Sequence, residues 1–209
     1  MKNFLLVLAI FLASLQISAQ TKFEQGMGKA FAAWSEGKST EAAALFERIG
    51  AAEPNEWLPD YYVSLINATS AFQTHDKQVI QSLLIKAQQF HDSASRKDPN
   101  NAEIMILQAL IHTASIVSDP MTNGQLLSGK VKELYFKALA LEPENPRAVF
   151  GLAEFEMGSA KFFKADTTPM CVQIDRAVEL FATFKPKSAM HPKWGADRAL
   201  AAQADCRKK

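Results

Sequence analysis

Residues 135–148 read Tyr-Phe-Lys-Ala-Leu-Ala-Leu-Glu-Pro-Glu-Asn-Pro-Arg-Ala, which combines the end of one helix with the start of another. An aromatic residue, alanines and leucines recur at helical spacing before Glu142. Pro143 disfavours helical backbone at the residue before it, and Asn145 is a residue type that caps the following helix. The stretch therefore predicts a tight corner between two helices.

This corner recurs along the chain at a nearly constant spacing. Pro54, Pro99, Pro143 and Pro186 follow one another at intervals of 45, 44 and 43 residues. An acidic residue precedes each of the first three prolines, whereas Pro186 lacks it. No strand-like alternation with hairpin turns interrupts the pattern. We therefore expect an all-α protein, a right-handed stack of about four helical hairpins with a C-terminal capping helix.

The first hairpin has the most regular length. Counting back from Pro54, a unit of 34 residues begins at Phe23 and places Gly37 in the turn between two helices. Ala42 and Phe46 then occupy the small and aromatic positions where the helices of such a unit cross. The residue types at these positions resemble those of the tetratricopeptide-repeat superfamily. This resemblance implies an α-solenoid that presents a concave binding face.

The later hairpins are about ten residues longer than this unit. We expect the extra length of the third hairpin in a loop at residues 118–124, which is rich in turn residues, and a capping box between Asn100 and Glu103. Thr168-Pro169 is expected to supply an N-cap and a first helical proline. The other expected helices cover residues 57–73, 79–96, 104–117, 125–141, 148–163 and 192–206, the last being the capping helix.

A narrower resemblance covers less than half of the chain. It is carried by Asp119-Pro120-Met121-Thr122 with Gly124-Gln125, by residues 138–147, and by His191-Pro192 with Trp194-Gly195 and the terminal Cys206. These motifs are similar to those of secreted, mostly uncharacterised tetratricopeptide-repeat proteins of Bacteroides-like and flavobacteria-like bacteria. Where that family often has a glycine-rich turn, this chain has Lys161-Phe162-Phe163-Lys164-Ala165-Asp166. The resemblance implies a fold and an envelope location, and it supplies no catalytic residue.

The N-terminus has the pattern of a secretory signal peptide. Lys2 precedes an almost unbroken apolar run at residues 4–15, and Ala19 ends a short segment of the kind that signal peptidases cleave. The run is shorter than the roughly 18 to 20 residues that a membrane-spanning helix needs. We expect residues 1–19 to be removed and residues 20–209 to form a single helical-repeat domain that is exported to the periplasm or the cell exterior.

Charge and motif content exclude several functions. The chain has 23 basic and 22 acidic residues, which argues against a general electrostatic grip on nucleic acid or on anionic membranes. After the signal peptide no apolar run is long enough to insert into a bilayer. The sequence has no phosphate-binding loop, nucleophile elbow or zinc-ligand motif. We therefore expect a non-enzymatic protein with no cofactor and no metal site.

The two cysteines are expected to form a disulfide. Cys171 opens the second helix of the fourth hairpin, Cys206 ends the last helix, and the midpoint between them falls in the connecting loop at residues 185–190. Two antiparallel helices folded about that loop would bring the sulfur atoms together, and an oxidising compartment would favour the bond. Two free thiols are the alternative.

The candidate functional surface is the concave face, which the first helix of each hairpin lines. Met27, Phe31 and Trp34 would line it in the first hairpin, and Phe150, Glu154 and Met157 in the fourth, although apolar residues of this kind also serve as ordinary core. The sequence thus predicts a scaffold that binds a protein or peptide partner in the cell envelope. A structural or assembly role in the envelope, without a discrete ligand, is the alternative.

Overall fold

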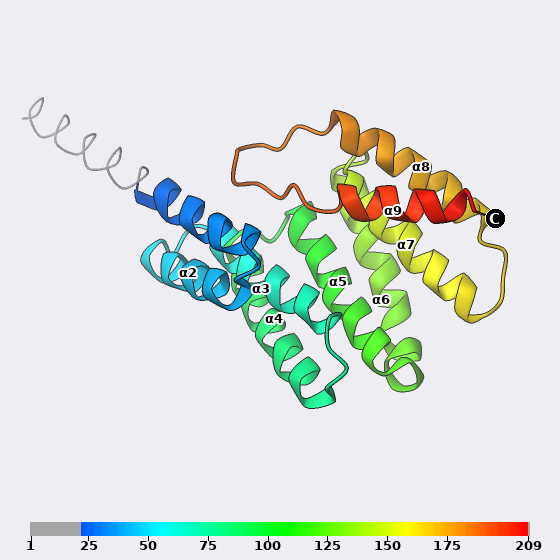
Figure 1. Cartoon of the computed structure of the whole chain (residues 1–209), viewed down its shortest axis with the longest axis horizontal. Coiled ribbons are helices and arrows are strands. Elements are labelled where there is room, and N and C mark those ends of the chain that lie inside the picture. Colours follow the sequence, from blue (N-terminus) through cyan, green and yellow to red (C-terminus); the bar gives the residue numbers. More distant parts are fainter. Residues whose placement is uncertain (1–21, 209) are drawn as a thin grey trace, which may run out of the picture.

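The computed structural model describes residues 22–208, and this part of the chain is helical without any strand. Residues 22–35 form the first helical segment. The later helices are α2 (Ser39–Ala52), α3 (Leu58–Ala71), α4 (Lys77–Lys97), α5 (Ala102–Ser118), α6 (Pro120–Leu141), α7 (Pro146–Phe162), α8 (Thr168–Thr183) and α9 (Ala196–Cys206). Figure 1 shows them stacked as successive antiparallel hairpins, with α9 lying beside α7 and α8. The predicted all-α stack with a C-terminal capping helix is confirmed. The predicted signal peptide lies outside the described residues.

Two corners between hairpins, those before α5 and α7, are built by asparagine caps. The Asn101 side chain accepts a hydrogen bond from the backbone N–H of Glu103 at 2.9 Å. The Asn145 side chain accepts from the backbone N–H groups of Arg147 at 3.0 Å and Ala148 at 3.3 Å. Each cap satisfies donors that a helix N-terminus leaves without an intrahelical partner. Asn145 in the opening stretch therefore starts α7 as the sequence predicts.

Three local expectations at helix starts are wrong. Residues 118–124 are not a loop, because Asp119 accepts a hydrogen bond from the Thr122 backbone N–H at 3.2 Å and α6 begins at Pro120. Glu103 does not close a capping box, because its carboxylate pairs with Arg147 instead. Thr168 is the first residue of α8 rather than its cap, and its backbone N–H donates to the Asp166 carboxylate at 2.9 Å.

Helix α3 lies at the centre of the N-terminal half. Twelve of its 14 residues are buried, because it packs against α2, α4 and α5. An aromatic cluster surrounds its first turns, where Tyr62 stacks on Phe46 with ring centroids 5.1 Å apart and meets Tyr61 edge to face at 5.2 Å. Such contacts add to the free energy of burying the rings. Helices α5 and α7 continue the same inner layer toward the C-terminus.

No helix within residues 22–208 is both long enough and apolar enough to cross a bilayer.

Candidate ligand-binding site

The three groove residues predicted in the first hairpin pack against the aromatic cluster. Met27 is fully buried. Phe31 and Trp34 are half-buried, and both meet Tyr62 edge to face, with ring centroids 4.7 Å and 5.9 Å away. Part of the Phe31 and Trp34 surface therefore stays accessible, whereas Met27 belongs to the core.

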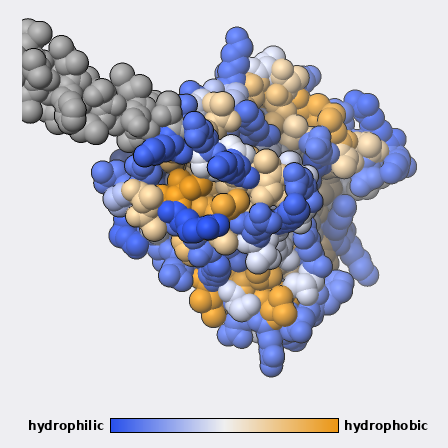
Figure 2. Space-filling view, turned by 60° about the vertical axis from the view of Figure 1, so that its left-hand side comes forward, coloured by the Kyte–Doolittle hydropathy of each residue, from blue (hydrophilic) through white to orange (hydrophobic). Residues whose placement is uncertain are grey.

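The three groove residues predicted in the fourth hairpin lie under the chain's own C-terminus. Phe150 and Met157 are buried in a cluster that includes Ala199 of α9. The Glu154 carboxylate accepts a hydrogen bond from Arg198 Nε of the same helix at 2.6 Å. Met27, Phe31 and Trp34 thus lie at one core cluster, Phe150 and Met157 belong to another, and Glu154 is half-buried beside α9. Figure 2 likewise shows apolar patches separated by hydrophilic residues on the face it presents.

A long connection between α8 and α9, residues 184–195, runs back toward the N-terminal half, and we call it the strap (Figure 1). The Met190 carbonyl accepts a hydrogen bond from the Tyr62 hydroxyl at 2.7 Å. Trp194 Nε1 donates to the Tyr61 hydroxyl at 2.8 Å. The strap therefore joins the last hairpin to α3, across more than 120 residues of sequence.

A buried ion pair joins α5 to α7 in the same region. Arg147 Nε and Nη2 donate to the Glu103 carboxylate at 2.7 Å and 2.6 Å, and the Asn145 amide donates to the same carboxylate at 2.6 Å. Arg147 is only 1% exposed, and the Phe184 ring of the strap lies 4.4 Å from its guanidinium carbon. A buried arginine of this kind needs a bidentate partner, because desolvation of an unpaired charge is very costly.

The charges and hydrogen bonds of this network stabilise the fold rather than prepare a side chain for catalysis. Burial alone would lower the pKa of Arg147, but the hydrogen bonds and charge of Glu103 outweigh it and raise that pKa above its ordinary value. Burial, reinforced by the charge of Glu103, raises the pKa of Tyr61 well above 10.0 and also raises that of Tyr62. The tyrosines therefore stay protonated near neutral pH and act as hydrogen-bonding anchors for the strap.

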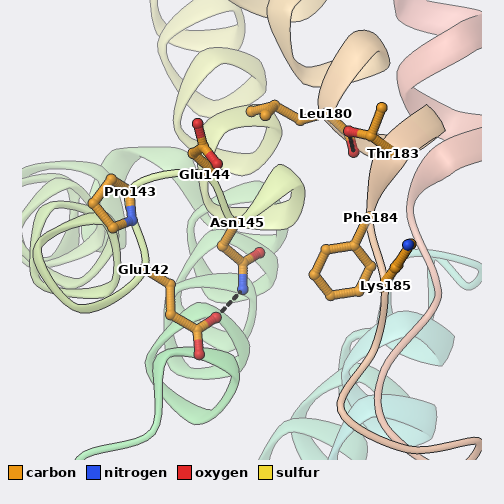
Figure 3. Close-up of a pocket in the computed structure, with 8 residues that line it drawn as sticks. All are labelled: Glu142, Pro143, Glu144, Asn145, Leu180, Thr183, Phe184 and Lys185. Atoms are coloured by element: carbon orange, nitrogen blue, oxygen red, sulfur yellow. Dashed lines mark hydrogen bonds between the residues drawn. The ribbon is translucent and has the colours of Figure 1, made fainter.

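One cleft of about 600 Å³ opens beside this network, between the α6–α7 corner and the end of α8. Figure 3 shows Glu142 and Asn145 on one side and Phe184 with Lys185 on the other. Burial opposes ionisation of Glu142, but hydrogen bonds from Asn145 and Lys187 outweigh it and lower the pKa of that carboxyl. The cleft is lined by Glu142, Pro143, Glu144, Asn145, Leu180, Thr183, Phe184 and Lys185. Three of these eight side chains, those of Glu142, Glu144 and Lys185, are charged, which makes the cleft a poor receptor for an apolar ligand.

A second cleft of about 340 Å³, which we call the α8 cleft, lies between α6, α7 and α8. Four of its lining residues are aliphatic and come from α6 and α7, whereas α8 supplies the thioether of Met170 and the guanidinium of Arg176. The full lining is Leu139, Val149, Leu152, Ala153, Glu156, Pro169, Met170, Gln173 and Arg176. An apolar wall with a few polar groups at the edge is the usual composition of a small-molecule site, and the volume is within the usual range of ~300–1,000 Å³.

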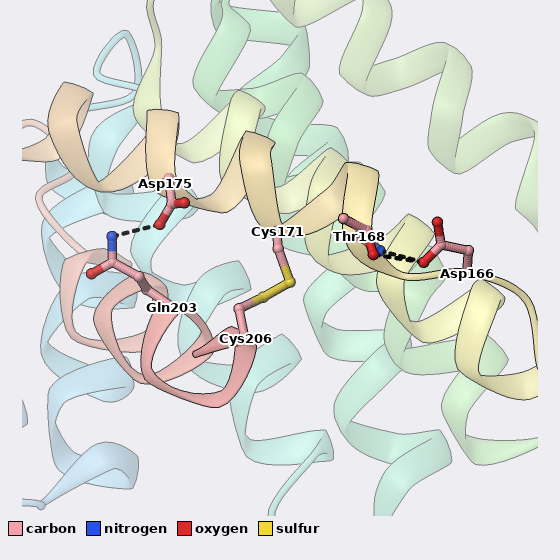
Figure 4. Close-up of a disulfide and its surroundings, with 6 residues drawn as sticks. All are labelled: Asp166, Thr168, Cys171, Asp175, Gln203 and Cys206. Atoms are coloured by element: carbon pink, nitrogen blue, oxygen red, sulfur yellow. Dashed lines mark hydrogen bonds between the residues drawn. A yellow bond between two sulfur atoms is a disulfide. The ribbon is translucent and has the colours of Figure 1, made fainter. Parts of the chain in front are cut away.

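The predicted disulfide is present. Cys171 in the first turn of α8 bonds to Cys206 at the end of α9, with Cα atoms 5.7 Å apart (Figure 4). Farther along the same two helices, the Gln203 amide donates to the Asp175 carboxylate at 2.8 Å. The disulfide fixes the capping helix on the helix that carries Met170 and Arg176. Among residues 22–208, no three His, Cys, Asp or Glu side chains gather as a metal site.

The fold has solved structural neighbours. The HusA haemophore from Porphyromonas gingivalis superposes with a TM-score of 0.76 and 21% identity, over 89% of this chain and 93% of that one. A thermophilic TPR protein of Thermus thermophilus superposes with a TM-score of 0.60 and 18% identity, over 90% and 82% of the two chains. No protein-family model matches the sequence, and no curated protein matches it. At these identities the neighbours establish a tetratricopeptide-like helical-repeat fold.

Sequence reasoning missed the ion pair and the α8 cleft. One signal for the ion pair was available, because Glu103 and Arg147 each lie four residues after a corner proline and so occupy equivalent positions of adjacent repeats. Opposite charges at equivalent positions can meet when repeats stack. For the α8 cleft no local signal exists, since its lining comes from three helices.

Proposed function

We propose that this chain is a non-enzymatic, exported binding protein of the cell envelope. The apolar N-terminal stretch and the disulfide support export, because disulfides persist in oxidising compartments. The sequence motifs shared with secreted proteins of Bacteroides-like bacteria agree with the Porphyromonas source of the haemophore neighbour. Arg147 and Asn145 both donate hydrogen bonds to Glu103 in the core, which supports a structural role for these charged groups rather than a catalytic one.

The ligand class that we propose is haem, held with one edge in the α8 cleft. The observation that carries this proposal is the end-to-end likeness to a haemophore. The cleft chemistry supports it, because apolar side chains suit a macrocycle and Met170 would offer a thioether, a group that haem proteins use to hold the iron. Arg176 at the edge suits a propionate carboxylate, which a guanidinium can bind through two hydrogen bonds.

A visible-absorption titration of the mature chain with haem tests this proposal. We expect a saturable change in the Soret band for the native chain. Met170→Leu should change the band position because it removes the thioether, and Arg176→Gln should weaken binding by roughly tenfold, because one charged hydrogen-bonding group is lost.

Matched controls exist on the same molecule. Met121 is 85% exposed at the start of α6 and Arg96 lies outside the cleft on α4. Met121→Leu and Arg96→Gln should bind haem like the native chain. Absence of a saturable change, or equal losses in the controls, would overturn the haem proposal.

A second candidate is the binding of a protein or peptide partner, for which the half-buried rings of Phe31 and Trp34 are the supporting observation. An accessible edge of a packed aromatic residue is a common anchor for a partner side chain. Affinity capture with the mature chain as bait should then recover a partner that Trp34→Ala loses. If neither haem nor a partner binds, the structural or assembly role in the envelope becomes the better proposal.

A further inference from the structure

The turn between α7 and α8 presents two phenylalanines to solvent. Phe162 is 64% exposed and Phe163 is 76% exposed, and their rings meet edge to face with centroids 5.1 Å apart. Lys161 and Lys164 flank the pair, and both are exposed. We call residues 161–164 the aromatic tip.

The backbone holds the aromatic tip in a defined shape. The Phe163 N–H donates to the Ser159 carbonyl at 3.0 Å, and the Ala165 N–H donates to the Ala160 carbonyl at 2.8 Å. Lys164 adopts a φ of 55°, a left-handed conformation that glycine adopts with less strain. The turn thus carries a charged side chain at a position where the backbone geometry would favour glycine.

The surroundings of the aromatic tip are basic. The end of α9 lies at the same end of the molecule (Figure 1), where the hydrogen bond and charge of Lys208, with a smaller contribution from the charge of Lys161, lower the pKa of the Asp205 carboxyl. Residues 161–167 and 205–208 contain four basic side chains, Lys161, Lys164, Arg207 and Lys208, against the two acidic ones of Asp166 and Asp205. Although the whole chain is nearly neutral, this end carries a local positive excess.

We propose that the aromatic tip docks the protein on an anionic lipid surface, independently of the haem proposal. Phenylalanine rings partition into the interfacial region of a bilayer, and flanking lysines attract anionic headgroups while their aliphatic stems stay in the apolar layer. A stable protein interface buries about 800 Å² on each partner, which is far more than two ring edges supply. Two phenylalanine rings are enough to insert into a bilayer, because lipid binding does not require a surface of complementary shape.

Co-sedimentation with phospholipid vesicles tests this inference. The mature chain at low salt should sediment with vesicles that contain anionic phosphatidylglycerol and not with pure phosphatidylcholine. The double variant Phe162→Ser/Phe163→Ser should partition roughly tenfold or more weakly, because it loses the apolar anchor. Lys161→Glu/Lys164→Glu should lose the preference for anionic lipid.

Phe136→Ser is the matched control. Phe136 is 54% exposed on α6, and two basic residues near it on this helix are paired, Lys137 with Glu133 at 2.6 Å and Lys132 with Glu156 at 3.1 Å. This variant should sediment like the native chain, and all variants should keep the native helical content by circular dichroism. The inference is overturned if the native chain ignores anionic vesicles or if the tip variant and the control variant behave alike. It is also overturned if the native chain self-associates through the tip, seen as concentration-dependent sedimentation that Phe162→Ser/Phe163→Ser abolishes.

Discussion

The N-terminal half and the C-terminal hairpin are held in place by different means. Helix α3 buries twelve of its 14 residues, whereas α8 buries only Ile174 and Ala177, and α9 buries only Ala199. The hairpin compensates with the Cys171–Cys206 disulfide and with the strap. The terminal helices of this array have few neighbours to pack against, and a covalent bond and long-range contacts hold them in place.

Truncating the aromatic core should have the largest effect. Phe46 is fully buried and contacts Phe31 and Tyr62, so Phe46→Ala should lower the free energy of unfolding by about 3–5 kcal/mol through lost burial and a cavity. Chemical denaturation measures the change. Phe136→Ala on the exposed face of α6 is the control and should stay within about 0.5 kcal/mol of the native chain. Equal effects of the two variants would contradict the assignment of the N-terminal core.

Breaking the buried ion pair between α5 and α7, which lie between the two regions, should cost nearly as much. Glu103→Ala would leave the guanidinium of Arg147 buried without its partner, which typically costs about 3–5 kcal/mol. The double variant Glu103→Met/Arg147→Leu removes both charges and should recover much of that loss. Denaturation curves that place the double variant below the single one would contradict this account.

Removing the disulfide should affect only the C-terminal hairpin. The bond closes a loop of 35 residues, so Cys206→Ser should cost on the order of 3 kcal/mol. Hydrogen exchange should show α8 and α9 losing protection before α3 does. Unchanged protection of α8 and α9 in the variant would show that the disulfide is not their main tie.

Weakening the strap should have a smaller effect. Trp194→Phe keeps an aromatic ring but removes the hydrogen bond to the Tyr61 hydroxyl, which should cost about 1 kcal/mol. Hydrogen exchange should show faster exchange in residues 184–195, with the core of α3 unchanged. A loss of protection throughout α3 would mean that the strap belongs to the N-terminal core.

Acidic pH should weaken the contact between the strap and Glu142, because it protonates the Glu142 carboxylate. The folded state lowers the pKa of Glu142 below its ordinary 4.5, so ionised Glu142 stabilises the fold above that pH. This contribution is lost as the pH falls through the lowered value and Lys187 loses its partner. Stability curves between neutral and acidic pH should therefore fall less steeply for Glu142→Gln than for the native chain. Parallel curves would exclude Glu142 as a contributor.

The helices were predictable because their signals are local. Repeated corner prolines and helical spacing indicated the hairpins, and the expected export together with the antiparallel helix geometry indicated the disulfide. Residues 118–124 were misjudged because Asp119-Pro120 is equally suited to a turn and to a helix N-terminus.

The long-range contacts were less predictable because they depend on segments far apart in the sequence. Charged residues are expected on the surface, so nothing in their residue types marks Glu103 and Arg147 as buried. Helix α9 packs over Phe150 and Glu154, and the strap returns to Tyr61. Both arrangements depend on contacts between residues that are far apart in the sequence. The groove predicted from repeat positions alone could not include them.

Hydrogen exchange of residues 20–209 with and without haem tests most directly whether ligand binding belongs to the C-terminal region. We predict that haem increases protection at residues 149–153 and 170–176, which line the α8 cleft, and leaves residues 22–35 unchanged. Protection confined to residues 22–35, or no change anywhere, would contradict the account.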